Sequence, residues 1–442
     1  CGDGHDLITT GKVDDLVFGG DGHDRVTWHA GNGSAWIDGG AGSDSVGITA
    51  TAARDDLTLT RAKGVPGFDL RVDVETPTDI SVTPILANAV EEINLNGGKG
   101  ADILRVHDLT GTGIRKVGLN LGDIVDVDHA EDDIAIFGTA DADNLRVDLQ
   151  DVIVKLDHKN GHQFGGVMRV EGLPNYAIYA ANVLDHARLS TLAGNDDVRI
   201  LGLPGPTTLI SSDGDDRITV SANQPGKFLA LADVDAGRGQ NRFEFEEVGL
   251  INAGGEFEDV DVVANNFQVF STHVPLGARY LASGGGYQQG VFITTGRGDD
   301  TVTLQSTRPD AATTIKTSFG ADHIILGNNG HLGDIRVGVS VDAGSGANQL
   351  TIDDHAASSG NGNVVVAGNQ VLNFAGANDN TPIDFKATGG TMTLHLEGSA
   401  SAALAEAFTI KSPAAQLGLA ANDGKDTIKV QALAQLAAVD AG

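Results

Sequence analysis

Apolar residues recur every nine positions over the first 47 residues of the chain. When the chain is counted in nines from Cys1, with an insertion at Trp28 and His29, the eighth position holds Ile8, Val17, Val26, Ile37 and Val46. The sixth position holds Asp6, Asp15, Asp24, Ala35 and Asp44. An apolar residue shortly after a polar turn is what a short strand needs to send one side chain inward. The pattern therefore predicts short β-strands joined by turns, with two nonapeptides in each coil and Asp6, Asp24 and Asp44 on one edge.

Glycine-rich turns give this pattern a candidate chemistry. Residues 19–24, 39–44 and 97–102 share the form Gly-Gly-x-Gly-x-Asp. Glycine lets the backbone turn sharply and point its carbonyl groups inward, and the Asp adds a charged oxygen to that cage. An all-oxygen cage suits a hard cation such as calcium. Plain turn chemistry is the alternative, because Asp side chains also accept hydrogen bonds from nearby backbone amides.

The full unit, Gly-Gly-x-Gly-x-Asp-x-apolar-x, resembles the hemolysin-type, or RTX, calcium-binding repeats. The resemblance implies a parallel β-roll in which each calcium ion lies between stacked turns, held by carbonyl oxygens and Asp carboxylates. Carried over residue by residue, it picks out as metal-binding residues Gly19, Gly20, Gly22, Asp24, Gly39, Gly40, Gly42, Asp44, Gly97, Gly98, Gly100 and Asp102. Asp6 is added as a metal-binding residue on the same edge, although Cys1 stands where the form has its first glycine. The turns at 10–15 and 30–35 depart from the form at Val13 and Ala35, so they are not counted as calcium sites.

Gly-Asp turns return in a longer rhythm through the rest of the chain. One set ends at Asp196, Asp216 and Asn241, a second ends at Asp300, Asp322 and Asn348, and a third opens at Asp426. Intervals within the first two sets are 20 and 25 residues, then 22 and 26 residues, each about one coil plus a small insertion. The five aspartates are predicted either as further calcium sites or as plain turns. The two asparagines carry no charge and are expected to be structural turns or weak sites.

These repeats predict an all-β chain folded as a right-handed parallel β-solenoid, either a β-roll or a β-helix, in the form of an elongated rod. The expected segments are a nonapeptide array at 1–47, spacer strands of the same solenoid at 48–95, super-repeats at 96–190, 191–293 and 294–418, and the start of a further repeat at 419–442. The run from Asp108 to Gly113, Asp-Leu-Thr-Gly-Thr-Gly, resembles a segment of very long bacterial RTX-like surface and secreted proteins.

Composition fits an extracellular repeat protein held together by cations. The net charge is −31, and a bare chain of that charge repels itself when it is compact. Several bound calcium ions would neutralise this charge and couple folding to metal. Cys1 is the only cysteine, so no disulfide can form within the chain; it is either a lipidated N-terminus or a fragment boundary. The resemblance implies export to the cell surface or medium by a type I-like route.

Motifs for catalysis are absent from the sequence. It contains no His-Glu-x-x-His, Gly-x-Ser-x-Gly or Walker motif, and we predict that the chain is not an enzyme. Six acidic residues, Asp123, Asp126, Asp128, Glu131, Asp132 and Asp133, form either a solvated acidic loop or another calcium site. No apolar run approaches the ~18 residues that span a bilayer, so we expect no membrane span. We also expect no nucleic-acid partner.

Three functions remain open at this stage. The first is structural: a calcium-stiffened segment of a bacterial adhesin, surface layer or filament, with self-association into fibres or a surface layer as a hypothesis. The second is a non-catalytic secretion and folding module of a toxin or hydrolase. The third is a β-helix enzyme that processes polysaccharides, which would need a basic groove and aromatic side chains to hold an acidic sugar chain. The sequence has only two Trp and four Tyr, and its 29 basic residues are outnumbered by 60 acidic ones, so it favours the structural function.

Overall fold

The computed structural model describes residues 1–77, 79–121, 130–157, 161–173, 176–181, 186–224, 226–249, 251, 255–358, 363–374, 382–401, 403–432 and 437–440. Within these residues every regular element is a β-strand, and the 38 strands belong to two mostly parallel sheets, sheet A and sheet B, of 19 strands each. The predicted all-β, mostly parallel architecture is confirmed. The chain divides into a first unit, Cys1–Asp216 with Lys227–Gly237, and a second unit, Arg217–Gly226 with Arg238–Gly442.

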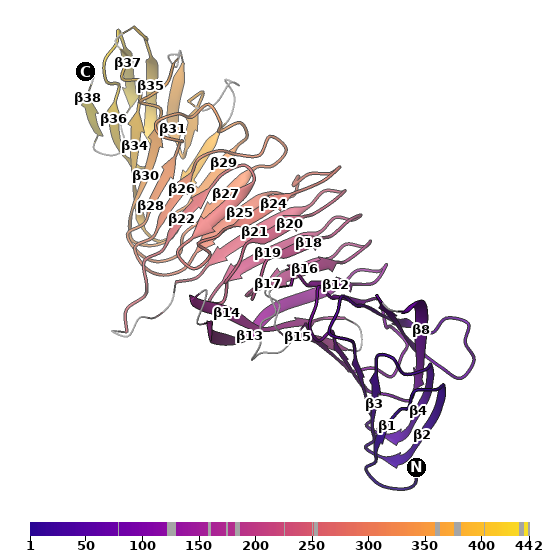
Figure 1. The fold of residues 1–442 in the computed structure, drawn as a ribbon. Helices are drawn as coiled ribbons and strands as arrows, with labels where there is room; N and C mark the ends of the chain where they lie inside the picture. Colours follow the sequence, from indigo (N-terminus) through magenta and orange to yellow (C-terminus); the bar gives the residue numbers. More distant parts are fainter. Residues whose placement is uncertain are drawn as a thin grey trace. The chain divides into compact units, whose positions relative to one another are not determined.

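The first unit contributes strands to both sheets (Figure 1). Its sheet A strands are β2 (Asp15–Gly22), β4 (Ala35–Gly42), β6 (Asp56–Arg61), β7 (Leu70–Thr76), β8 (Asp79–Asn88), β10 (Ile103–Val106), β12 (Asp133–Phe137), β16 (His186–Ser190), β18 (Thr207–Ile210) and β20 (Ala232–Asp235). Its sheet B strands are β1 (Leu7–Thr9), β3 (Arg25–His29), β5 (Ser45–Thr49), β9 (Glu92–Asn96), β11 (Lys116–Asn120), β13 (Asn144–Asp157), β14 (Gly161–Glu171), β15 (Ala177–Ala181) and β17 (Asp197–Ile200).

The nonapeptide array forms the predicted coils. Strands β1, β3 and β5 pair in parallel, with Ile8 beside Val26 and Val26 beside Val46. Strands β2 and β4 pair in parallel in the other sheet, with Val17 beside Ile37. Each coil therefore takes one strand to each sheet, and each eighth-position residue faces the interior between the sheets. Inward and outward side chains alternate along these strands, as in the buried–intermediate pattern of β5.

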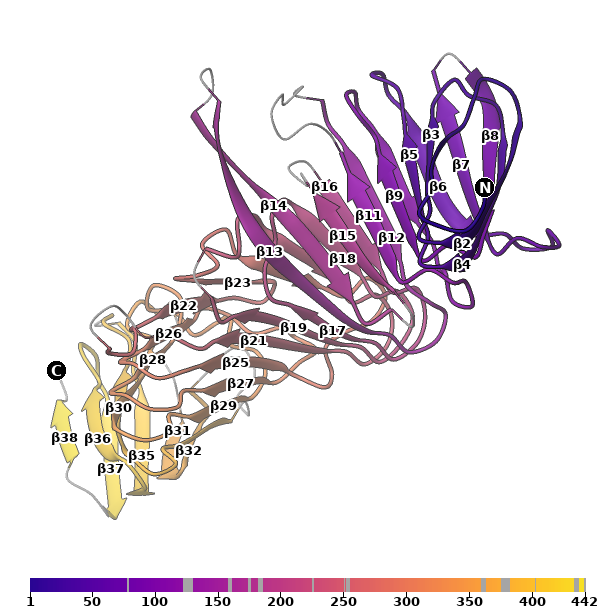
Figure 2. The ribbon, with the colours of Figure 1, turned by 90° about the horizontal axis from the view of Figure 1, so that it is seen from below.

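Antiparallel excursions interrupt the coils at regular stages, a feature that the repeats did not predict. In the first unit, β6, β7 and β8 zigzag within sheet A before β8 pairs with β4 and β6 pairs with β10. Later, β13, β14 and β15 zigzag within sheet B, and Figure 2 shows β13 and β14 as a long hairpin. The predicted spacer at 48–95 thus contains antiparallel strands. Alternating apolar and polar residues suit either direction of pairing, so the sequence pattern does not distinguish them.

The second unit repeats this arrangement. Its sheet B strands are β19 (Arg217–Ala222), β21 (Arg242–Glu247), β25 (Val291–Thr295), β27 (Thr313–Lys316), β29 (Val339–Asp342), β31 (Val364–Gly368), β32 (Gln370–Leu372), β33 (Ile383–Lys386), β35 (Ala407–Pro413) and β37 (Thr427–Ala432). Its sheet A strands are β22 (Asp261–Ala264), β23 (Gln268–Ser271), β24 (Ala278–Leu281), β26 (Thr301–Leu304), β28 (His323–Leu326), β30 (Ala347–Asp353), β34 (Thr391–Glu397), β36 (Gln416–Ala420) and β38 (Ala437–Asp440). Antiparallel excursions occur at β22–β24 in sheet A and at β31–β33 in sheet B.

Candidate metal centre

The turns that lead from sheet A into sheet B are joined by a row of carboxylates, the first ladder. The Asp6 N–H donates to Asp24 Oδ1 at 2.8 Å, and the Asp24 N–H donates to Asp44 Oδ1 at 2.7 Å. The Asp44 N–H then donates to Glu91 Oε2 at 2.7 Å. Each carboxylate therefore ties its own turn to the turn before it. The predicted stacking of Asp6, Asp24 and Asp44 on one edge is confirmed.

Four further ladders follow the same rule. The second joins Asp55, Asp102 and Asp132; the third joins Asp143, Asp196 and Asp216; the fourth joins Asp300, Asp322 and Asn348; the fifth joins Glu406 and Asp426. The first, third and fifth ladders precede strands of sheet B, whereas the second and fourth precede strands of sheet A. Every aspartate predicted from the repeats belongs to a ladder.

The second carboxylate oxygen of several ladder aspartates is buried without a hydrogen-bond partner among the described residues, and these include Asp196, Asp300 and Asp322 of the third and fourth ladders. In the first ladder Asp24 and Asp44 are 2% and 3% exposed, and their Oδ2 atoms are buried without a hydrogen-bond partner among the described residues. A buried, unpaired carboxylate oxygen is costly unless it is protonated or meets a cation. These oxygens therefore point to a ligand.

Glycine lets the backbone approach these oxygens closely. A side-chain carbon built on Gly19 would overlap both Asp24 Oδ2 and the Gly39 carbonyl oxygen of the next turn. A carbon built on Gly39 would lie 2.8 Å from Asp44 Oδ2 and would overlap the Ala89 carbonyl oxygen. Each glycine thus lies against one carboxylate oxygen and one carbonyl oxygen, which are the ligands that calcium takes in proteins. We call this pair of oxygens beside a glycine a glycine-walled cradle.

The second ladder contains the third full match to the nonapeptide form. A side-chain carbon on Gly97 would lie 2.7 Å from Asp102 Oδ2, as in the first ladder. The turn stacks on residues 51–55, since a carbon on Gly98 or Gly100 would contact the Thr51 or Ala53 backbone. The first-ladder glycines stack likewise: Gly20 on Gly2, Gly22 on Gly4, Gly40 on Gly20 and Gly42 on Gly22. Close stacking of turns is therefore a second reason for glycine at these positions.

Hydroxyl groups take the place of the first glycine in the third and fourth ladders. Thr191, Thr295 and Thr317 lie five residues before Asp196, Asp300 and Asp322, where the full matches have glycine. Each hydroxyl lowers the pKa of its aspartate, but burial outweighs this effect and raises the pKa. We call these turns hydroxyl-walled cradles, because a hydroxyl group stands where the full matches have their first glycine.

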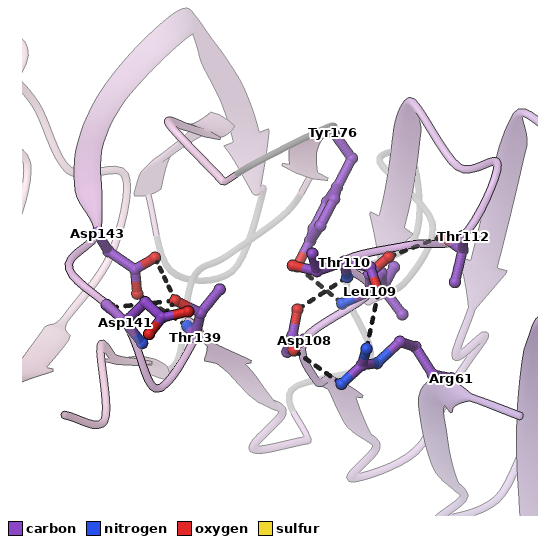
Figure 3. Close-up of polar contacts among 9 residues, drawn as sticks. All are labelled: Arg61, Asp108, Leu109, Thr110, Thr112, Thr139, Asp141, Asp143 and Tyr176. Carbon is purple, nitrogen blue, oxygen red and sulfur yellow. Dashed lines mark hydrogen bonds and ion pairs between the residues drawn. The ribbon is translucent and has the colours of Figure 1, made fainter. Parts of the chain in front are cut away.

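Two other turns donate hydrogen bonds to their own carboxylate, which satisfies both oxygens of Asp143 but only Oδ2 of Asp55. In Figure 3 the Thr139 N–H donates to Asp143 Oδ2 at 2.8 Å, and the Thr139 hydroxyl donates to Asp143 Oδ1 at 3.0 Å. At the start of the second ladder, the Thr51 N–H and hydroxyl both donate to Asp55 Oδ2, at 2.7 and 2.6 Å. Asp143 therefore closes its own turn and offers less to a cation, whereas Asp55 Oδ1 is buried without a hydrogen-bond partner among the described residues.

Burial raises the pKa of several ladder aspartates. It raises the pKa of Asp216 to about 7 and the pKa of Asp300 to about 6, against hydrogen bonds that favour the charged form. The pKa of Asp44 is also raised, again chiefly by burial. Repulsion from the neighbouring ladder carboxylate contributes at Asp44, Asp216 and Asp300. A cation would reverse both effects by favouring the ionised form.

Sequence reasoning missed three members of the ladders: Glu91, Asp55 and Glu406. Each is an isolated acid without the glycine spacing, and the partners of Glu91 and Asp55 lie 47 residues away in the chain. Asp132, assigned to an acidic cluster that was expected to be a solvated loop or a calcium site, is instead a buried member of the second ladder. Asp123, Asp126 and Asp128 lie outside the described residues.

Comparisons with known proteins identify no relative: neither the protein-family models nor the curated proteins contain a match to this chain. In the part of the chain that the structure describes, no helix has the length and apolar character needed to cross a membrane.

Proposed function

We propose that this chain is a calcium-binding structural repeat protein, a β-solenoid in which calcium ions stiffen the stacked turns. The single observation that carries the proposal is the set of buried Oδ2 atoms in the first ladder, each paired with a carbonyl oxygen in a glycine-walled cradle. The donor set is all oxygen, which suits calcium better than zinc or copper. The RTX resemblance, which rests on the same residues, supports this reading.

Calcium would act on two features of the ladders at once. It would neutralise carboxylates such as Asp24 and Asp44, which lie on successive turns linked by a 2.7 Å hydrogen bond. It would also bridge a side chain of one turn to a carbonyl of the next, which adds a cross-link to the N–H hydrogen bond already present. Because the net charge is −31, neutralisation also reduces repulsion throughout the chain. Folding and calcium binding are therefore coupled.

The finer features of the proposal follow from this chemistry and from the resemblance. We propose a right-handed solenoid, as crossovers between parallel strands almost always have that hand, and an elongated rod. We propose a location outside a bacterial cell, as part of an adhesin, surface layer or filament, after export by a type I-like route. Association of successive copies into fibres belongs to the same proposal, since strands at the end of a stack have unpaired edges.

A thermal unfolding experiment tests the proposal. The chain is stripped with chelator, and its far-ultraviolet circular dichroism and melting temperature are followed as calcium is added. We expect calcium to raise the melting temperature, with magnesium much less effective because it demands octahedral geometry and dehydrates reluctantly. Asp44→Asn should reduce the calcium response, whereas Asp299→Asn, at an exposed position, serves as the matched control. An unchanged melting curve in chelator and calcium would show that the ladders are turns without metal.

A further inference from the structure

A cavity of about 550 Å³ lies in the first unit, away from the glycine-walled cradles. Its walls come from the ends of three neighbouring sheet A strands, β6, β10 and β12, from the start of β7, and from the turn before β17. Cavities of this size commonly hold small ligands. Nothing in the proposed calcium chemistry requires this cavity, so its function is a separate question.

Four side chains form a row across the outer face of sheet A on one side of the cavity. Arg71 is the cross-strand partner of Thr60 in β6. In the parallel pairing of β6, β10 and β12, Val106 lies beside both Leu59 and Ile136. The residues that follow, His107 and Phe137, therefore continue the row that contains Thr60. Adjacent strands are ~4.8 Å apart, so Arg71 and His107 stand about 10 Å apart with the short Thr60 between them. The row therefore contains a slot about one ring wide.

Aromatic rings form one wall of the slot. The imidazole of His107 stacks on Phe137 with ring centres 4.5 Å apart and planes 5° from parallel. Burial and Arg105 lower the pKa of His107, so the imidazole is neutral at pH 7. Its free face can pack against the polarised C–H groups of a sugar ring, because aromatic faces carry partial negative charge.

The cavity is also basic, in a chain where acidic residues outnumber basic ones by 60 to 29. Its lining includes three cations, Arg61, Lys63 and Arg71, and one carboxylate, Asp108. Arg61 is held in place by Asp108 at 3.1 Å and by the Thr110 carbonyl at 2.9 Å, as Figure 3 shows. The pKa of Asp108 is lowered, because hydrogen bonds from Thr110 and attraction by Arg61 and Lys63 outweigh its burial.

Lys63 is the cation left to meet a ligand. Arg71 is paired with Asp73 at 2.7 Å and Arg61 with Asp108 at 3.1 Å, whereas Lys63 is exposed and interacts with Asp108 only by longer-range attraction. A single ammonium without a close ion pair, beside a ring-sized slot, favours one carboxylate attached to a ring. A doubly charged phosphate would need more positive charge than this lining supplies.

We infer that this cavity binds a carboxylated sugar, with its ring against His107 above Thr60 and its carboxylate at Lys63. Uronates and sialates share this chemistry, and either can supply the ligand. The inference goes beyond the proposed calcium function and does not rest on it.

Isothermal titration of the full chain in calcium tests the inference with three probes: methyl glucuronate, methyl sialate glycoside with a free carboxylate, and neutral methyl glucoside. We expect at least one acidic sugar to bind, and the neutral sugar to bind at least about tenfold more weakly. The acidic sugar that binds more tightly identifies the source. Equal binding of acidic and neutral sugars, or no binding of either acidic sugar, would overturn the inference.

Variants separate the cavity from general electrostatics. Lys63→Met should weaken binding of the acidic sugar by about tenfold, and Thr60→Phe should abolish it by filling the slot. Lys12→Met makes the same charge change at an exposed position in the same unit and should leave binding unchanged. Equal effects of Lys63→Met and Lys12→Met would contradict a site at Lys63. Thr60→Val, which keeps the size of the side chain, controls for folding of β6.

Discussion

Substitution of a ladder aspartate by asparagine should have opposite effects on the stability of the calcium-loaded protein in the two kinds of cradle. Asparagine keeps the oxygen that accepts the neighbouring N–H, as Asn348 does from Asp322 at 3.0 Å, but it removes the charge. At Asp300, in a hydroxyl-walled cradle, loss of the charge should stabilise the protein both with and without calcium. At Asp44, in a glycine-walled cradle, it should stabilise the chelated protein and destabilise the calcium-loaded one.

The magnitude at Asp300 follows from its pKa. Burial raises this pKa from 3.8 to about 6, and each unit corresponds to about 1.4 kcal/mol. Below its ordinary pKa of 3.8, the Asp300 carboxyl is protonated in both the folded and the unfolded chain and does not lower the free energy of unfolding. That free energy falls as the pH rises from 3.8 to the folded pKa of about 6. The ionised carboxylate therefore costs about 3 kcal/mol above pH 6. Because Asp300 is 1% exposed, little of this cost is screened by water.

Urea denaturation near neutral pH, in chelator and in excess calcium, measures the effect. Asp300→Asn should raise the free energy of unfolding by about 3 kcal/mol in both conditions. Asp299→Asn is the matched control, because Asp299 also accepts a backbone N–H, from Ala321 at 2.7 Å, but is exposed. A lower stability of Asp300→Asn in chelator would refute the desolvation argument. A change of the same sign at Asp44 in both conditions would refute the role of the glycine-walled cradle.

Three further predictions follow from the fold. Asp216, whose folded pKa is about 7 instead of 3.8, should make the chelated protein lose about 4 kcal/mol of unfolding free energy between pH 4 and 7, measured by urea midpoints across that range. Gly22→Ala should lower the free energy of unfolding by about 3 kcal/mol, because its φ of 144° and the carbonyl group of the preceding turn leave no room for a side chain. Gly333 has no neighbouring atom where a side-chain carbon would lie, so Gly333→Ala should change stability by less than about 0.5 kcal/mol in the same assay. His273→Leu should cost about 3 kcal/mol, because the fully buried Glu247 loses its ion pair and keeps the hydrogen bond from Ser271. The double variant with Glu247→Leu should recover most of this loss in a double-mutant cycle.

The sequence was most informative where each coil is two nonapeptides long. There the spacing of Asp24 and Asp44 sets both the turn and the strand after it, so coil and ladder could be predicted together. The antiparallel excursion at β6–β8 could not, because its alternation of apolar and polar residues fits either pairing direction. It also separates Asp44 from Glu91 by 47 residues, so that the next member of the ladder is distant in sequence. The meeting of such residues is a property of the stacked coils.

The cavity at Lys63 was beyond sequence reasoning for the same reason. Basic residues look scattered along the chain, yet Lys63 and His107 line the same cavity because β6 and β10 are neighbours in sheet A. Net charge and composition average over such clusters and so conceal them.

The central claim is that the buried Oδ2 atoms of the first ladder bind calcium. Crystallography of the calcium-loaded protein, at a wavelength where calcium scatters anomalously, tests this most directly. We predict an anomalous peak about 2.3–2.6 Å from both Asp24 Oδ2 and the Gly39 carbonyl oxygen, and a second beside Asp44 Oδ2. An ordered first ladder with no peak at either place in saturating calcium would contradict the claim.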